Sequence, residues 1–217
     1  MKLYGYFRSS TAYRVRIALN LKGVLVKHVP VHMLRGGGEQ HQPAYRAINP
    51  QGVIPTLVDG DVRLGQSLAI IEYLEETRPT PALLPADPLD RARVRQLANI
   101  IACDIHPIDN LRVLTYITTR LGASAQQKAD WYRHWILEGF KAFEALIADD
   151  PRTGAFCHGD QPGLADLCLI PQVYNARRFD CPLDDFPTIA RIDAACNALE
   201  AFRKAAPENQ IDAPPAG

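Results

Sequence analysis

The stretch FRSSTAYRVRIALN, Phe7–Asn20, places three hydroxyl residues in a row where a strand-like run gives way to a helix. The run before it, KLYGYF at residues 2–7, has the short apolar character of a strand. Apolar residues then recur at helical spacing over residues 10–22, and Gly23 is suited to end that helix. The stretch therefore predicts a strand that turns directly into a helix.

The hydroxyl residues are Ser9, Ser10 and Thr11. A helix N-terminus leaves backbone N–H groups unpaired and carries a partial positive charge, which suits an anion. Simple capping is the alternative, but one cap would suffice and three hydroxyls are present. We interpret the three as candidates for holding a carboxylate or a thiolate. No cysteine of the chain lies nearby, so a thiolate would have to come with a ligand.

The next segments continue a mixed α/β pattern. Residues 24–31 are predicted to form a second strand, and two apolar runs around Asp59 and Gly60 are typical of a hairpin. Ser67 is expected to cap a helix that ends before Pro79.

A proline-rich linker at 78–89 separates this part from a helical remainder. Pro107 is expected to bend a long helix, and the tail from Pro207 is expected to be loose. The pattern predicts a mixed α/β domain at 1–80 and an all-helical domain at 88–217. The predicted helices of the second domain are 89–121, 125–147, 164–178 and 187–205.

Composition excludes several classes of function. The 217 residues are 47% hydrophobic, and 24 Lys and Arg balance 24 Asp and Glu, so we expect neither nucleic acid nor a membrane as a partner. We expect no signal peptide and a cytoplasmic location. Five cysteines without C-x-x-C spacing predict neither a disulfide framework nor a metal site, and all five are expected to be small buried side chains.

Two further constellations lie in the first domain. Pro55 directly precedes a predicted strand, where a cis peptide bond occurs, and we expect Ile54 to offer free backbone N–H and C=O groups to a peptide-like ligand. An ordinary trans proline is the alternative. Gln66 and Ser67 at a helix start could hold a carboxylate or simply cap the helix.

With these motifs the chain resembles the zeta class of glutathione transferases, which includes maleylacetoacetate and maleylpyruvate isomerases. The resemblance extends over almost the whole chain. The segments that carry it are SSTAYRVRIALNLKG (9–23), NPQGVIPTL (49–57), QSLAIIEYLEE (66–76), CDIHPIDNLRVL (103–114) and GLADLCLIPQVYNARRF (163–179). It implies a thioredoxin-like N-terminal domain, an all-α C-terminal domain, a homodimer and glutathione as the cofactor.

The resemblance also implies roles for individual residues. Ser9 would stabilise the glutathione thiolate, with Ser10 and Thr11 close by. The implied glutathione contacts are Gln40, Ile54, Pro55, Gln66, Ser67, His106 and Asp109, and the implied substrate contacts are Arg8, Arg112 and Arg178. His106 could instead act as an acid–base group or only pack, and Arg8 could point to solvent.

The chain departs from the family pattern at several positions. Thr11 replaces a common cysteine, Tyr13 replaces a tryptophan, and Asp109 replaces an asparagine or glutamine. Gly163 stands where a serine or threonine caps a helix. Arg14 and Arg16, two positions apart in the first helix, point in different directions and are expected to be structural or at the surface.

The implied reaction is cis–trans isomerisation of a dianionic maleyl substrate by reversible addition of the glutathione thiolate. Arginines suit such a substrate because a guanidinium pairs with carboxylates. The form of the first motif favours maleylacetoacetate, in aromatic amino-acid breakdown, over maleylpyruvate. A general glutathione transferase or dehalogenase is the enzymatic alternative, and a binding module without catalysis is the other.

Overall fold

The computed structural model describes residues 1–215 and divides into two compact units. The first unit contains Met1–Leu83 together with the chain from Asn197 onward, and the second contains Leu84–Cys196. The sequence assigned everything after residue 88 to the second domain, so the return of the C-terminal segment to the first unit corrects that expectation. The last two residues of the predicted domain, 216–217, lie outside the described residues.

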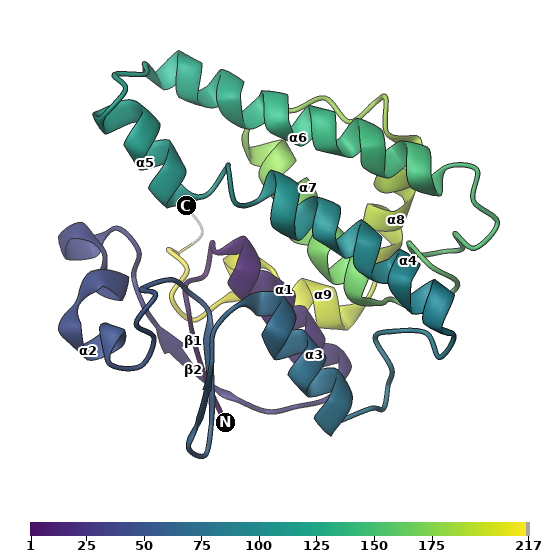
Figure 1. Cartoon of the computed structure of the whole chain (residues 1–217), viewed down its shortest axis with the longest axis horizontal. Helices are drawn as coiled ribbons and strands as arrows, with labels where there is room; N and C mark the ends of the chain where they lie inside the picture. The colour runs from purple at the N-terminus through teal and green to yellow at the C-terminus, as the bar shows by residue number, and fades with distance from the viewer. Residues whose placement is uncertain (216–217) are drawn as a thin grey trace. The chain divides into compact units, whose positions relative to one another are not determined.

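A mixed four-stranded sheet forms the base of the first unit, with strand order β2-β1-β3-β4. Strand β1 pairs parallel to β2 and antiparallel to β3, and β3 pairs antiparallel to β4. Leu3 lies opposite His28 on one side and Leu57 on the other. Figure 1 shows α1 and α3 to one side of this sheet and α2 to the other. The elements are β1 Lys2–Gly5, α1 Ser10–Leu21, β2 Lys27–Pro30, η1 Arg35–Gly37, η2 Glu39–His41, α2 Pro43–Arg46, β3 Thr56–Asp59, β4 Val62–Leu64, α3 Ser67–Thr77, α9 Glu200–Ala205 and η4 Pro207–Asn209.

Helix α1 begins at the predicted Ser10 and ends at Leu21, one residue before the predicted end. Ser9 is its N-cap, and Gly23 adopts the positive φ of 64° that ends a helix without steric cost. Every residue from Ala12 to Leu19 is buried, and α3 and α9 both pack against this helix. The first strand and the helix therefore form the strand-to-helix turn that the sequence predicted.

The C-terminal segment packs on α1 and is ordered. Asn20 Nδ2 donates to the Ala201 carbonyl at 2.8 Å, and Phe202 is fully buried. Beyond α9, Pro207 is buried and Gln210 Nε2 donates to the Ala206 carbonyl at 2.8 Å. The expectation of a loose tail from Pro207 was wrong for the described residues, since local composition does not report these contacts.

The second unit is helical, as predicted, but its first long helix is broken. A π-helix follows α4, and residues 106–110 form turns before α5 begins, so Pro107 lies between helices rather than inside a bent one. The predicted helix at 187–205 is likewise two helices, α8 and α9. The elements are α4 Pro88–Asn99, η3 Ile100–Ile105, α5 Leu111–Thr119, α6 Ala125–Ile147, α7 Leu164–Arg178 and α8 Pro187–Asn197.

Asp166 holds the start of α7 in place of a hydroxyl cap. Its two carboxylate oxygens accept from the N–H groups of Cys157 and Gly163, at 2.9 and 2.8 Å. The pair of bonds explains how Gly163 serves as the N-cap without a side chain of its own.

Four of the five cysteines are buried, as expected, but Cys103 on the π-helix is exposed. Among residues 1–215, no helix combines the length and apolar character needed to cross a membrane.

Candidate functional site

The hydroxyls at the start of α1 form a line of hydrogen bonds. The Ala12 N–H donates to Ser9 Oγ at 3.2 Å, so Ser9 does cap the helix. Ser9 Oγ lies 2.9 Å from Thr11 Oγ1, and Thr11 Oγ1 donates to the Ile54 carbonyl at 3.0 Å. Ser10 is the first residue of the helix and is buried. The structure thus brings Ser9, Thr11 and Ile54 together.

The Ile54–Pro55 peptide bond is cis, as the resemblance implied. The expectation of two free backbone groups at Ile54 was wrong in one part, because Thr11 already bonds the carbonyl. The side chain of Ile54 packs in a buried cluster with Tyr6, Val31 and Tyr45.

The segment at the start of α3 differs from a simple serine cap. Gln66 is the N-cap residue and has a φ of 63°, which is uncommon for a residue with a side chain. Its Nε2 donates to Gln51 Oε1 at 2.8 Å. Ser67 is instead the first helical residue, and its buried Oγ accepts from Arg14 Nη1 at 3.4 Å. A backbone held in such a conformation is a frequent feature of functional sites.

Gln40 is buried on η2. Its Nε2 lies 3.1 Å from His41 Nε2 and 3.4 Å from the Met33 carbonyl. Its Oε1 has no hydrogen-bond partner among the described residues. Because a buried polar atom is normally paired, this oxygen is an acceptor that the described residues leave unused.

Four of the predicted site residues belong to the second unit. The N–H of His106 donates to the Ile101 carbonyl at 2.9 Å and closes the π-helix. The side chain of Asp109 is only 4% exposed and has no hydrogen-bond partner among residues 1–215. Burial raises its pKa from 3.8 to about 8. Asp109 therefore offers almost no surface for direct contact with a ligand.

The predicted substrate arginines are all exposed. Arg8 lies over the Phe7 ring, with its guanidinium carbon 5.8 Å from the ring centroid. Arg112 is the second residue of α5, and Arg178 is the last residue of α7. Arg178 Nη1 donates to Asn175 Oδ1 at 3.1 Å.

Arg14 and Arg16 do point in different directions, but both are buried and neither lies at the surface. Arg14 reaches the start of α3, while Arg16 reaches the loop before α1 and the C-terminal segment. The signal that could have revealed them is the apolar character of α1 on every face, which leaves an arginine no route to solvent.

The chain is similar to a known protein family and to several known proteins. The family model described as "Glutathione S-transferase, N-terminal domain" matches residues 3–82. A probable maleylacetoacetate isomerase of Vibrio cholerae is 52% identical over 211 residues, covering 97% of each protein. The holo structure of a maleylpyruvate isomerase, described as a bacterial glutathione S-transferase of the zeta class, has a TM-score of 0.96 at 51% identity and covers 99% of this chain and 100% of that one.

A third similar protein carries ligands. The structure of maleylacetoacetate isomerase from Methylobacterium extorquens AM1, with bound malonate and glutathione, has a TM-score of 0.94 at 43% identity. The match covers 99% of this chain and 100% of that one.

Proposed function

Since the chain belongs to the zeta class of glutathione transferases, we propose that it is a glutathione-dependent cis–trans isomerase of a dianionic maleyl substrate. The observation that carries the proposal is the line from Ser9 through Thr11 to Ile54, at the N-terminus of a helix, in a chain about half identical to both kinds of maleyl isomerase. When bound, glutathione supplies a thiolate that adds to the cis double bond and is expelled after rotation, so that it is not consumed.

The first unit has groups that fit this cofactor. The backbone N–H of Thr11, in the first turn of α1, has no hydrogen-bond partner among the described residues and lies where the helix carries partial positive charge. Such a position lowers the pKa of a thiol, which is about 8.5 when free. The unpaired Oε1 of Gln40 and the strained backbone of Gln66 are further features of a built binding site.

Ser9 must redirect its proton to stabilise a thiolate. Thr11 uses its single hydroxyl proton on the Ile54 carbonyl, so Ser9 is the donor in the contact with Thr11. Rotation of the Ser9 hydroxyl turns this proton toward a sulfur placed at the helix start. We assign Ser9 to the thiolate, the Ile54 N–H to the cysteinyl part, Gln66 and Ser67 to the γ-glutamyl carboxylate, and Gln40 to the glycine end.

The substrate carboxylates are assigned to Arg8, Arg112 and Arg178, whose exposed guanidinium groups suit bidentate pairing. Negative charge that develops on the substrate after thiolate addition needs electrostatic stabilisation, which cationic groups supply. We keep His106 as a further contact to glutathione or substrate. The relatives give no preference between maleylacetoacetate and maleylpyruvate, since representatives of the two kinds are 52% and 51% identical to this chain. The form of the first motif still favours maleylacetoacetate.

We further propose a homodimer in the cytoplasm. The resemblance to the zeta class supports the homodimer, and light scattering after size-exclusion chromatography tests it. The cytoplasmic location agrees with five cysteines that form no disulfide in the structure.

The deciding experiment supplies each maleyl substrate in large excess over glutathione and follows product and free thiol together. We expect many turnovers per glutathione with free thiol unchanged. Loss of free thiol in step with product would instead indicate a transferase or dehalogenase. The maleyl compound with the higher kcat/KM is the preferred substrate of the two.

A further inference from the structure

The loop Tyr6–Ser9, between β1 and α1, leads directly into the proposed thiolate site. The Tyr6 carbonyl accepts from the Ser9 N–H at 3.0 Å, so the loop is a tight turn. Arg8 and Ser9, which carry proposed roles, are the last residues of this turn. The position of the Phe7 peptide groups therefore sets the position of both side chains.

Arg16 holds this loop from inside α1. Its guanidinium donates to the Phe7 carbonyl at 2.9 Å and, at 3.4 Å, to the Tyr6 carbonyl that also bonds Ser9. Its Nε donates to the Ala205 carbonyl at 2.9 Å. The residue is only 4% exposed, so a buried cation joins the loop to the end of α9.

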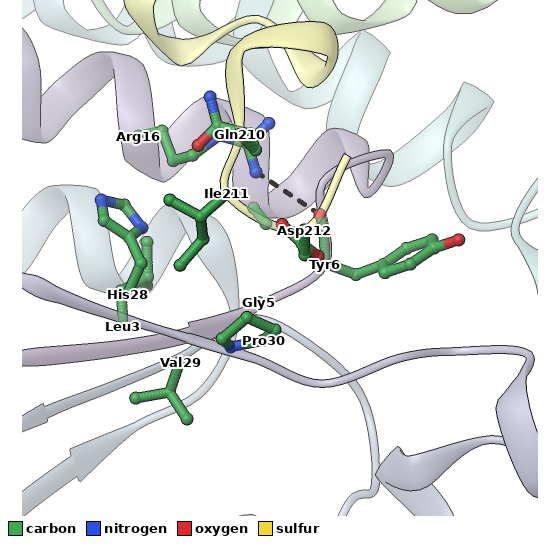
Figure 2. A pocket seen from close by; sticks show the side chains of 11 residues that line it. Leu3, Gly5, Tyr6, Arg16, His28, Val29, Pro30, Gln210, Ile211 and Asp212 are labelled. Atoms are coloured by element: carbon green, nitrogen blue, oxygen red, sulfur yellow. Dashed lines mark hydrogen bonds between the residues drawn. The ribbon is translucent and has the colours of Figure 1, made fainter. Parts of the chain in front are cut away.

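Asp212, in the C-terminal segment, bonds the same loop as Arg16. Its Oδ2 accepts from the Phe7 N–H at 2.9 Å, across 205 positions of sequence. Figure 2 shows Asp212 and Arg16 near Tyr6, with the hydrogen bond from Arg16 to Tyr6 drawn. Ionised groups thus bond both the N–H and the C=O of Phe7, and such charge-assisted bonds are about twice as strong as neutral ones.

The space beside these groups is too small for a ligand. The cavity lined by Arg16, His28 and Asp212 has a volume of about 20 Å³, which holds about one water molecule. The contacts of Asp212 and Arg16 with the loop therefore act on the chain itself rather than on a bound molecule.

We propose that Arg16 and Asp212 are positioning residues that hold the Tyr6–Ser9 loop, so that the C-terminal segment sets the geometry of the glutathione site. The proposal rests on the proposed function. Small displacements of groups that contact reacting atoms are costly, since about 1 Å can reduce the rate about 100-fold.

Three variants test whether Asp212 holds the loop. They are Asp212→Ala, Asp212→Asn and the control Glu208→Gln. Asn keeps an oxygen that can accept the Phe7 N–H, whereas Ala does not. Glu208 is an exposed carboxylate of the same segment with no hydrogen bond or ion pair among the described residues, so its variant reproduces the change of charge alone. Asp212 is more suitable than Arg16 because it is half-buried, whereas Arg16 is buried within α1 and its replacement would also remove packing inside the first unit.

Glutathione affinity is measured by calorimetry, the pKa of the bound thiol by ultraviolet absorbance against pH, and Phe7 amide exchange by NMR. For Asp212→Ala we expect about tenfold weaker glutathione binding, a raised thiol pKa and about tenfold faster exchange at Phe7. Asp212→Asn should recover most of each effect, and Glu208→Gln should match the wild type.

Unchanged affinity, thiol pKa and Phe7 exchange in Asp212→Ala would overturn the proposal, as would equal losses in Asp212→Ala and Glu208→Gln. Failure of the proposed function is a separate result, seen when the wild type binds glutathione but does not isomerise either maleyl substrate. If the wild type does not bind glutathione at all, the proposed link between the segment and that site is overturned, while Phe7 exchange still reports whether Asp212 holds the loop.

Discussion

The Thr11 hydroxyl donates to the Ile54 carbonyl over 3.0 Å and lies 2.9 Å from the Ser9 hydroxyl. The Ala12 N–H in turn donates to Ser9 Oγ. These bonds join the first turn of α1 to the loop before β3, although 43 positions separate Thr11 from Ile54. A position that commonly carries cysteine in the zeta class therefore has a structural hydroxyl in this chain.

Replacement of Thr11 by valine should weaken glutathione binding about tenfold, because the Ile54 carbonyl and the Ser9 hydroxyl each lose a partner. Thr11→Ser keeps the hydroxyl and should bind like the wild type. Calorimetric titration of glutathione into the three proteins measures the effect. Equal affinities would show that the hydroxyl has no part in binding.

Ser9→Ala should reduce kcat about 100-fold or more, since it removes a donor to the developing anion. It should also lower the free energy of unfolding by about 1 kcal/mol, because the helix cap is lost. Ser124→Ala is the matched control, since Ser124 caps α6 and also accepts a backbone N–H at 3.2 Å. Steady-state kinetics and urea unfolding of both variants separate the two effects. A Ser9 variant that loses stability but keeps its kcat would show that Ser9 only caps the helix.

Features with a local signal were predictable from the sequence. The cap at Ser9, the end of α1 at Gly23 and the hairpin at Asp59 and Gly60 each depend on a few adjacent residues and were found where expected. The place of Pro55 at a strand start left both a cis and a trans bond open, and the resemblance to the zeta class implied the cis bond that is present. The order of these elements was enough to indicate the two-part fold.

Features that depend on distant residues were not predictable. The contact between Phe7 and Asp212 joins the two ends of the chain, and no local pattern reports such a pairing. The break near Pro107 was mistaken for a bend because a periodic pattern continues on both sides of it. At Gln66 the backbone adopts a positive φ that neither its side chain nor its neighbours indicate.

Asp109 should make the protein less stable as pH rises. Burial raises its pKa from 3.8 to about 8, so between these values the folded state binds a proton that the unfolded state has released. The free energy of unfolding should therefore fall by up to about 1.4 kcal/mol per pH unit across this window. Asp109→Asn removes the ionisation and should stabilise the protein at pH 8 more than at pH 5.

Urea unfolding at both pH values measures this difference, with Asp104→Asn as the control because Asp104 is an exposed carboxylate of the same region. The control should not change the pH dependence. An Asp109→Asn protein whose stability falls with pH as steeply as that of the wild type would show that this carboxyl is already ionised at neutral pH.

A buried ion pair joins the end of α1 to α3 and to the chain beyond it. Lys22 Nζ donates to Glu75 Oε2 at 2.8 Å and to the carbonyls of Arg78 and Pro81 at 2.7 and 2.8 Å. The Lys22 side chain is fully buried, and Glu75 also accepts the N–H of Leu83. Lys22→Met should therefore lower the free energy of unfolding by about 3 kcal/mol, because a buried carboxylate loses its counter-charge.

Lys141→Met provides the comparison in the same urea unfolding experiment. Lys141 pairs with Glu138 at 2.7 Å, but both side chains are at least half exposed, so water replaces the lost partner. The stability of this variant should be almost unchanged even though the two ion pairs have nearly the same length. Similar losses in the two variants would mean that burial of the Lys22–Glu75 pair adds nothing to the cost of breaking it, and that distance alone determines the effect.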